Sequence, residues 1–564
     1  MLALVASFAA LGGFLFGYDL GLIAGALLYM ETDLGLTEGA EEVIVGTAKL
    51  GAVFGTFIGG ALMQDLGRKR AIAWNSAFFI AGPVIMASAP NASVVSLGRF
   101  VVGLGVGVSA VVVPAYVGEM APPKKRGAVV ITYELMLCFG MIASGVMDFA
   151  LRDARDNWRW MVGAPVVPAL AMLLSIVILP ESPRWLVIRG ELTEALEVIH
   201  KLRERVEMPG RDQSTAQVEA ELMELWSAVE KEYHEVRGGA ARGGGGGGGG
   251  GGGSGWLTGG SSGEIQEIVP SPRGREAGED DGNGNGTATT AHGNHNQADG
   301  FFRTLLTVIT DVGRVYRGPE QRAFRLALWL AFFNQACCST SVINFAPKIL
   351  ERAGVDERDD AVLFASAVSV TKAAGVTLSM FLVDRAGRRF LLVAGSFAAA
   401  VAMACLAVAY AANDAFAALL FMCGFMLAFS ASWAGVFWVL MSELFSMRAK
   451  SAAMSATTAL LFATGAVTDF VFLSVASAMG GWVFGLIACV CVAGGLYVQM
   501  ELPETKGATL AEVQAMLASG GDRAGDGDST EGGLSSWARR FIERLRAGGA
   551  ARASEAQRRY AELT

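Results

Sequence analysis

The sequence predicts an all-α membrane protein whose twelve transmembrane helices form two six-helix repeats. Hydrophobic residues make up 52% of the 564 residues and charged residues only 17%, which leaves too little charge to cover a soluble protein of this size. Apolar runs of about 20 residues, the length that crosses a bilayer, recur along the chain. Three short polar motifs occur twice at matching places, which indicates an internal duplication.

The apolar runs divide the chain into four regions. An N-terminal half over 1–180 and a C-terminal half over 323–500 are each expected to contain six spans. A loop over 181–322 joins them, and a tail covers 501–564. The first run is too long for the apolar core of a signal peptide, so we expect it to form a spanning helix. The twelve predicted spans are 2–30, 43–63, 71–90, 94–118, 127–150, 160–180, 323–350, 361–383, 390–411, 416–441, 452–476 and 480–500.

The charges of the short loops predict the orientation. The loops after the second, fourth, eighth and tenth spans are basic, whereas the loop 31–42 carries five acidic residues and no Lys or Arg. Lys and Arg favour the cytoplasmic side of a membrane. We therefore expect both termini and the joining loop in the cytoplasm, and we expect the plasma membrane rather than an internal membrane.

The joining loop has three predicted parts. Residues 181–236 are predicted to be helical, and residues 301–322 to form an amphipathic helix that leads into the seventh span. Between them, the Gly-rich segment 238–300 is predicted to be a disordered tether. The tail contains a short basic amphipathic stretch, and both a helix on an anionic membrane surface and a solvated helix remain open for it.

The sequence contains no pattern that is typical of an enzyme or a metal site. The seven cysteines all fall in apolar segments, without the spacing of a disulfide framework or of a zinc site. No nucleophile–base arrangement and no phosphate-binding loop is found. We therefore expect no catalytic residues, no cofactor and no metal.

Three motifs are repeated between the halves, after the second and eighth, the fourth and tenth, and the sixth and twelfth spans. The third pair reads Pro-Glu-Ser-Pro-Arg-Trp over 180–185 and Pro-Glu-Thr-Lys-Gly over 503–507. The charged motif residues are Asp65, Arg68, Glu119, Arg126, Glu181 and Arg184 in the first half, and Asp384, Arg388, Glu443 and Lys450 in the second.

These motifs resemble those of the sugar porter family of the major facilitator superfamily, over residues 1–237 and 301–510. The resemblance implies the major facilitator fold, with two halves that rock around a central site and give alternating access. It implies that the motif residues form a cytoplasmic charge network, which is closed when the carrier is open to the outside. It also implies a small-molecule substrate and a proton as partners in a lipid bilayer. We expect a monomer and no nucleic acid.

Ionisable residues inside spans are costly and are functional hypotheses by default. Five stand out: Asp19, Arg99, Glu134, Lys372 and Asp469. Asp19 and Arg99 are expected in the outer half of the bilayer, where they are predicted to pair. Proton-coupled family members carry Asp and Arg at these motif positions, which implies that protonation of Asp19 breaks the pair. A static structural ion pair is the alternative.

Glu134 and Lys372 stand at positions where the family's sugar carriers usually have Gln and Asn facing the central cavity. Two interpretations remain open: a buried ion pair that bridges the halves, or a site for a charged or zwitterionic substrate. Snorkelling of Lys372 to the interface is a third. The other residues that the resemblance assigns to substrate binding are Asn334, Gln335, Thr340 and Trp433.

The tenth span has Ala434 and Gly435 where the family often has Gly-Pro, so we expect less bending there. The favoured function is proton-coupled uptake of a sugar, polyol or similar small hydroxylated solute. The alternatives are a facilitative carrier, a carrier of a charged organic solute, and a nutrient sensor that transports nothing.

Overall fold

The computed structural model describes residues 11–120, 126–203, 222–223, 226–227, 296–318, 320–354, 358–445, 447–506, 512–513 and 516–517. All of these residues belong to one compact unit, Met1–Ala518. The described residues form helices, turns and loops, with no strand among them. The predicted tail helix and the Gly-rich segment up to residue 295 lie outside the described residues.

The N-terminal half contains six spans. Its spans are α2 (Leu11–Leu34), α3 (Glu38–Asp65), α4 (Arg68–Ala87), α5 (Ala92–Met120), α6 (Arg126–Leu151), and α7 (Asn157–Gly163) with α8 (Val166–Leu174) and η2 (Ser175–Val177). This half is followed in the described part of the joining loop by helices α9 (Pro183–Arg189), α10 (Leu192–Arg203) and α12 (Asn296–Arg317).

The C-terminal half also contains six spans. They are α13 (Gln321–Ala336) with α14 (Ser339–Asn344), α16 (Arg358–Ala386), α17 (Arg388–Ala411), α18 (Ala415–Phe429) with η3 (Ser430–Ala434) and α19 (Gly435–Leu444), α20 (Met447–Met479) and α21 (Trp482–Glu501). A short helix, α15 (Ala346–Arg352), follows α14. Twelve spans among the described residues are long and apolar enough to cross a membrane, which confirms the predicted number.

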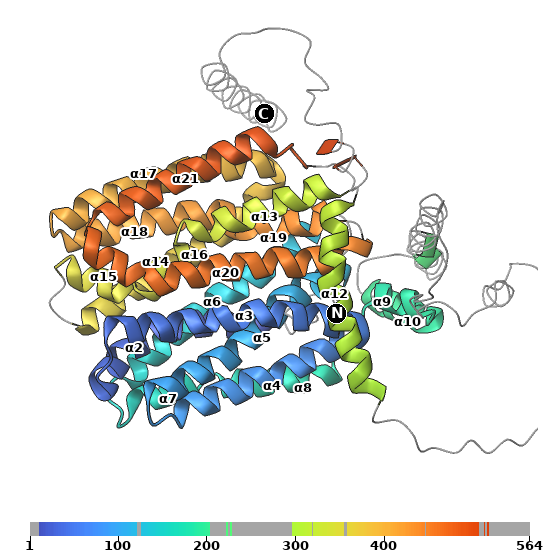
Figure 1. Cartoon of the computed structure of the whole chain (residues 1–564), viewed down its shortest axis with the longest axis horizontal. Coiled ribbons are helices and arrows are strands. Elements are labelled where there is room, and N and C mark those ends of the chain that lie inside the picture. The colour runs from blue at the N-terminus through green and yellow to red at the C-terminus, as the bar shows by residue number, and fades with distance from the viewer. Residues whose placement is uncertain are drawn as a thin grey trace, which may run out of the picture. The chain divides into compact units, whose positions relative to one another are not determined.

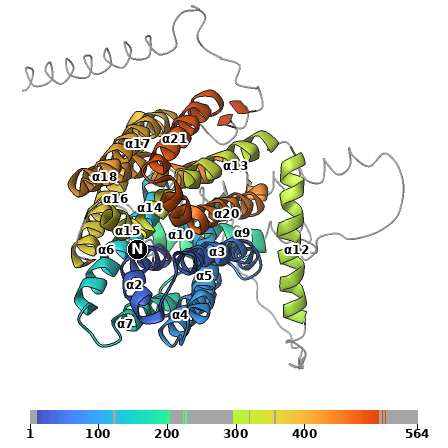
Figure 2. The same ribbon diagram turned by 60° about the vertical axis from the view of Figure 1, so that its left-hand side comes forward.

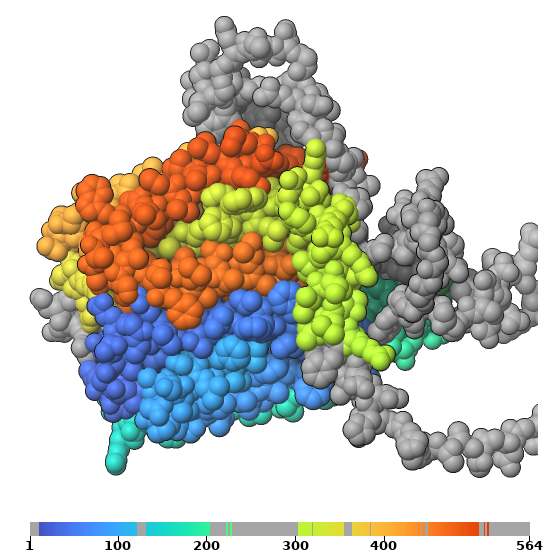
Figure 3. Space-filling view, viewed as in Figure 1, coloured from blue at the N-terminus to red at the C-terminus, as the bar shows by residue number. Residues whose placement is uncertain are grey.

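The two halves lie side by side, with the N-terminal half in blue to teal and the C-terminal half in yellow-green to red (Figures 1 and 2). They meet where α3 packs against α20 and where α6 packs against α16. The space-filling view shows the boundary between α3 and α20 as a line between blue and orange atoms (Figure 3). The interface therefore follows the second and eleventh, and the fifth and eighth spans.

Glycines hold α3 and α5 close together within the N-terminal half. A Cβ atom on Gly51 or Gly55 would overlap backbone atoms of α5, and one on Gly103 or Gly107 would overlap backbone atoms of α3. Small residues at such a seam let two helix backbones approach in a membrane. These glycines therefore have a packing role, and α3 and α5 are expected to move together.

The seventh span departs from the prediction of one continuous helix over 323–350. Cys338 has a left-handed φ of 55°, which ends α13 and precedes α14. Pro347 then lies in the first turn of α15, where its missing N–H and its ring prevent a helix from continuing through it. The polar residues around the break therefore lie at the end of α13 and on the short helix α14.

The tenth span is distorted without a proline. Residues Ser430–Ala434 form a π-helical turn at the place where reduced bending was expected. Such turns are local irregularities that are frequent at functional sites, and they change the direction in which the following side chains point. The missing Gly-Pro therefore does not make this span regular.

The amphipathic helix α12 contacts both halves, through α3 and α20, and lies across the ends of the spans in Figure 1. Its Val308 side chain is buried, whereas Leu306 and Ile309 are exposed. The helix begins at Asn296, whereas the segment predicted to be disordered extends to residue 300.

The bundle has two chemically different ends. Helix α3 begins at one of them, with Glu38, and ends at the other, with Asp65. The acidic end carries Glu31, Glu38, Glu41 and Glu42, and lies at the left in Figure 1. The motif end carries the repeated motif residues that are described, and lies at the right beside α9 and α12.

Candidate functional site

The motif end of the N-terminal half is held by a network around Glu119 and Glu181. Gly67 has a φ of 87°, which places the start of α4 next to the Glu181 carboxylate. The backbone N–H groups of Arg68 and Lys69 donate to Glu181 Oε1 at 2.9 and 3.2 Å. The Arg68 guanidinium pairs with Glu119 at 2.9 Å. Ser182 Oγ donates to the other oxygen of Glu119 at 2.6 Å.

The C-terminal half repeats this network with equivalent atoms. Gly387 has a φ of 91°, and the backbone N–H groups of Arg388 and Arg389 donate to Glu504 at 2.9 and 3.2 Å. The Arg388 guanidinium pairs with Glu443 at 3.0 Å. Arg68 Nη1 and Arg388 Nη1 each donate to a backbone carbonyl five residues earlier, both at 3.2 Å. The duplication that the motifs indicated is therefore present in the hydrogen bonds.

Burial raises the pKa of the Glu181 carboxyl above its ordinary value. Hydrogen bonds from the backbone N–H groups of Ser182, Lys69 and Arg68 act in the opposite direction, because they stabilise the charged form. Glu181 is a half-buried residue whose carboxylate oxygens hold the turn before α4.

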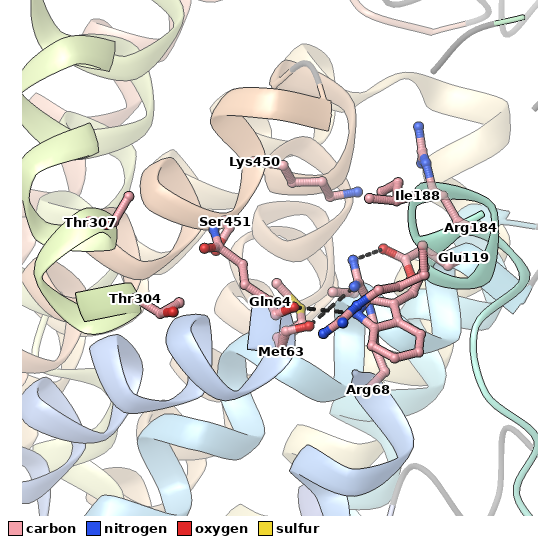
Figure 4. Close-up of a pocket in the computed structure, with 13 residues that line it drawn as sticks. Met63, Gln64, Arg68, Glu119, Arg184, Ile188, Thr304, Thr307, Lys450 and Ser451 are labelled. Carbon is pink, nitrogen blue, oxygen red and sulfur yellow. Dashed lines mark hydrogen bonds and ion pairs between the residues drawn. The ribbon is translucent and has the colours of Figure 1, made fainter. Parts of the chain in front are cut away.

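A cavity of about 290 Å³ opens at the motif end (Figure 4). It is lined by residues of both halves and of α9 and α12, and Lys450 of α20 interacts electrostatically with Glu119 of α5. Arg184 also lines the cavity and attracts Glu119. Asp65 contributes its backbone carbonyl, which accepts a hydrogen bond from Arg189 at 2.6 Å. The side chains of Arg126 and Asp384 lie outside the described residues.

Asp19 and Arg99 form a buried ion pair between α2 and α5. The two residues are 4% and 2% exposed. Arg99 Nε also donates to the backbone carbonyl of Ile44 at 3.4 Å. The predicted pairing is present, whereas the predicted role in proton coupling stays a prediction.

Glu134 and Lys372 are buried, at 6% and 5% exposure, but no direct ion pair joins them. Their charges interact electrostatically, and Glu134 Oε1 instead accepts a hydrogen bond from the indole N–H of Trp438 at 2.6 Å. Glu134 Oε2 has no hydrogen-bond partner. The bridge between the halves at this place is therefore the contact of Glu134 on α6 with Trp438 on α19, and a direct ion pair, which was one of the open interpretations, is not formed.

Trp433 does not join the other residues that were assigned to substrate binding. Its indole N–H donates to Ser396 Oγ at 2.8 Å, inside the C-terminal half. Trp438, five residues later, lies against Glu134 and has its ring 5.8 Å from that of Tyr133, edge to face. Trp433 lies within the π-helical turn, and of the two tryptophans it is Trp438 that faces the other half.

The polar residues of the seventh span surround a second ion pair. Lys49 of α3 pairs with Asp469 of α20 at 2.7 Å, and donates to Thr340 Oγ1 at 2.5 Å. Thr340 in turn donates to Gln335 Oε1 at 2.9 Å, and Gln335 donates to Asn334 Oδ1 at 3.3 Å. The structure therefore brings Asn334, Gln335 and Thr340 together, but around Lys49 rather than Glu134.

Sequence reasoning noted Asp469 but missed Lys49 and a further buried acid, Asp148 of α6. Both lie within predicted spans, so the same search for ionisable residues in apolar runs was sufficient to find them. Asp148 is 2% exposed, and its Oδ1 has no hydrogen-bond partner. Lys49 also lines one small cavity together with Asp19, Arg99 and Asp469. The two ion pairs are therefore neighbours.

Comparison with known proteins agrees with this architecture. The family model described as sugar (and other) transporter matches residues 5–240 and 286–517. The probable metabolite transport protein CsbC of Bacillus subtilis is 29% identical over 516 residues, which cover 90% of this chain and 93% of that protein. The galactose-proton symporter of Escherichia coli K12 is 25% identical over 521 residues, covering 91% of this chain and 93% of that protein.

Solved structures with the same fold include the proton:xylose symporter XylE of Escherichia coli bound to 6-bromo-6-deoxy-D-glucose. It matches with a TM-score of 0.68 at 22% sequence identity, over 92% of this chain and 99% of that structure. The two halves of six spans are thus arranged as in the major facilitator fold.

Proposed function

Because the chain belongs to the sugar (and other) transporter family, the sugar porters of the major facilitator superfamily, we propose that it takes up a sugar, polyol or similar small hydroxylated solute together with a proton. The family is one of multi-pass membrane transporters and not of enzymes. The observation that carries proton coupling is the buried Asp19–Arg99 ion pair. The names of the galactose-proton symporter and of XylE agree with this proposal.

The proposed coupling follows from the cost of an unpaired buried charge. While Asp19 is ionised, its carboxylate compensates the Arg99 guanidinium, and both are shielded from water. A proton on Asp19 removes this compensation and leaves Arg99 as a buried charge without its counter-ion, which is costly. The protonated carrier is therefore driven to rearrange, so that the bound solute and the proton move together.

In this proposal the motif end faces the cytoplasm and the acidic end faces outside, as the charges of the loops favour. The termini, the joining loop 181–322 and the tail are then cytoplasmic, and the plasma membrane is the proposed location. The halves 1–180 and 323–500 act as the two bodies of alternating access. The described motif residues form the proposed cytoplasmic charge network, and Asn334, Gln335, Thr340 and Trp438 supply groups that suit a hydroxylated solute.

The test is uptake into proteoliposomes from a panel of sugars and polyols, with and without an imposed pH gradient. We expect accumulation above the external concentration only with the gradient. Asp19→Asn is expected to abolish accumulation while exchange of labelled for unlabelled solute persists, because a neutral Asp19 mimics the protonated state. Asp153→Asn is the matched control, since Asp153 also neighbours an arginine but is exposed. Intact accumulation in Asp19→Asn contradicts the proposal.

A charged organic solute is the second candidate, because Glu134 keeps a buried oxygen without a hydrogen-bond partner. A cationic or zwitterionic solute supplies the donor that this oxygen lacks. Adding amino sugars and amino polyols to the panel separates the candidates. Transport of a cationic solute is expected to be lost in Glu134→Gln, whereas transport of a neutral solute is expected to survive, because Gln still accepts from Trp438.

A further inference from the structure

We propose that Lys49 and Asp469 form a transport-linked ion pair between the halves, in which Lys49 occupies the polar groups of the seventh span while the acidic end is closed. This proposal rests on the proposed function and adds to it a residue pair that opens and closes the substrate site. A solute reaches Thr340 from the acidic end only after the Lys49 ammonium has left.

The pair is buried and crosses the interface. Lys49 is 6% and Asp469 0% exposed, and their charged atoms are 2.7 Å apart. Lys49 belongs to the N-terminal half, whereas Asp469 and Thr340 belong to the C-terminal half. Any movement that separates α3 from α20 at this height must therefore break both the ion pair and the hydrogen bond to Thr340.

The Asp469 carboxylate also accepts hydrogen bonds from its own half. Ser341 Oγ donates to Asp469 Oδ1 at 2.6 Å, and Asn344 Nδ2 donates to Oδ2 at 3.3 Å. The backbone carbonyl of Gly465 is a further acceptor for Lys49, at 3.2 Å. The C-terminal half thus presents a preformed group of oxygens, which Lys49 enters from the other half.

The acidic end is closed around this pair. Glu41 pairs with Lys348 across the halves, and Glu42 accepts hydrogen bonds from the backbone N–H and the hydroxyl of Ser474, both at 2.8 Å. Gly46, one turn before Lys49, packs against the ring of Phe470. The closed acidic end and the occupied polar groups therefore belong to the same conformation.

Breaking the pair by opening differs from breaking it by mutation. When the halves part, both charges regain water, so the cost of burying them is relieved and the closure is reversible. Removal of one partner leaves the other as an uncompensated charge in the closed interface, which is strongly unfavourable. Removal of both charges leaves no uncompensated charge in the interface, so the acidic end is expected to close again.

The experiment measures opening of the acidic end with a cysteine at Val45. Val45 is 1% exposed, lies one turn before Lys49, and lines the cavity shared with Asp469. In right-side-out proteoliposomes, a membrane-impermeant maleimide is expected to modify Val45→Cys slowly. Lys49→Met or Asp469→Asn in that background is expected to raise the rate roughly tenfold or more. The chain without Val45→Cys gives the background of the seven native cysteines.

The double variant Lys49→Met with Asp469→Asn is expected to return the rate to within about threefold of the Val45→Cys parent. Arg352→Gln is the control, because its ion pair with Glu38 also joins the halves but is exposed. Unchanged rates in both single variants overturn the proposal. A double variant as reactive as the singles also overturns it, since that result indicates general loosening. Monodisperse elution in detergent shows that each variant is folded.

Labelling needs neither solute nor pH gradient, so it is independent of the proposed function. A chain that transports nothing in the panel but shows the expected labelling refutes the function and keeps the ion pair as a closure device. A chain that shows active transport but unchanged labelling supports the function and refutes the proposed role of the ion pair. In an active chain, Lys49→Met is also expected to lower the KM for external solute and to lower the maximal rate, because the outward-open state is favoured.

Discussion

The ion pairs at one end of the bundle lie within a half, whereas those at the other end join the two halves. At the motif end, Arg68–Glu119 lies within the first half and Arg388–Glu443 within the second, with equivalent atoms and nearly equal distances. At the acidic end, the pairs of Lys348 and Arg352 with Glu41 and Glu38 join one half to the other. The motif-end pairs stabilise each half as a body, and the acidic-end pairs stabilise one arrangement of the two bodies.

The largest effect is expected from Gly46→Trp at the acidic end. A Cβ atom at Gly46 would already lie 2.6 Å from the Phe470 ring, so an indole there holds the halves apart. Net uptake in proteoliposomes is expected to fall to the level of empty liposomes. Gly39→Trp is the control on the same helix, because no atom lies within 4 Å of a Cβ there. Normal uptake by Gly46→Trp contradicts the idea that this end must close.

The next effect is expected from Arg68→Ala and Arg388→Ala at the motif end. Each removes a charged hydrogen bond within one half, and the free energy of unfolding is expected to fall by about 1.5–3 kcal/mol in both variants. Thermal unfolding in detergent measures the loss, with exposed Arg303→Ala as the control. If only one of the two variants loses stability, the equivalent ion pairs do not contribute equally to the free energy of unfolding.

The smallest effect is expected from Arg352→Gln at the acidic end. The charged groups of Arg352 and Glu38 are 2.5 Å apart, but their side chains are 30% and 49% exposed. A double-mutant cycle with Glu38→Gln is expected to give a coupling energy of about 0–1 kcal/mol, decreasing with added salt. A coupling energy as large as that of Lys49 with Asp469 removes the distinction between exposed and buried pairs across the halves.

The difference between the ends also explains what the sequence predicted. The motif end was predictable because its residues occur twice, and repetition is visible without a structure. The spans were predictable from the length of the apolar runs. The Asp19–Arg99 pair was predictable because charged residues are rare inside such runs. The pairing of Lys49 with Asp469 has no repeated counterpart to reveal it, since it depends on how two helices from different halves are rotated and aligned.

The sequence assigned Trp433 to the substrate site, whereas Trp438 is the tryptophan that contacts the other half, and the reason again lies in helix rotation. Both tryptophans lie within the same apolar run, 416–441, and position along the sequence does not reveal which one faces the other half. The π-helical turn over Ser430–Ala434 changes the rotation of the residues that follow it. Cys338 likewise breaks the seventh span through its left-handed φ, which no periodicity of apolar residues signals.

The closed hydrogen-bond circuits at the motif end have a consequence for what one half contains by itself. The hydrogen-bond partners of Glu119 and Glu181 lie in the first half and the motif that follows it, and those of Glu443 and Glu504 lie in the second half and the motif that follows it. A single six-helix unit with the motif that follows it would therefore contain every hydrogen-bond partner of its own circuit. The Lys49–Asp469 pair requires two such units, because each unit supplies one of its partners.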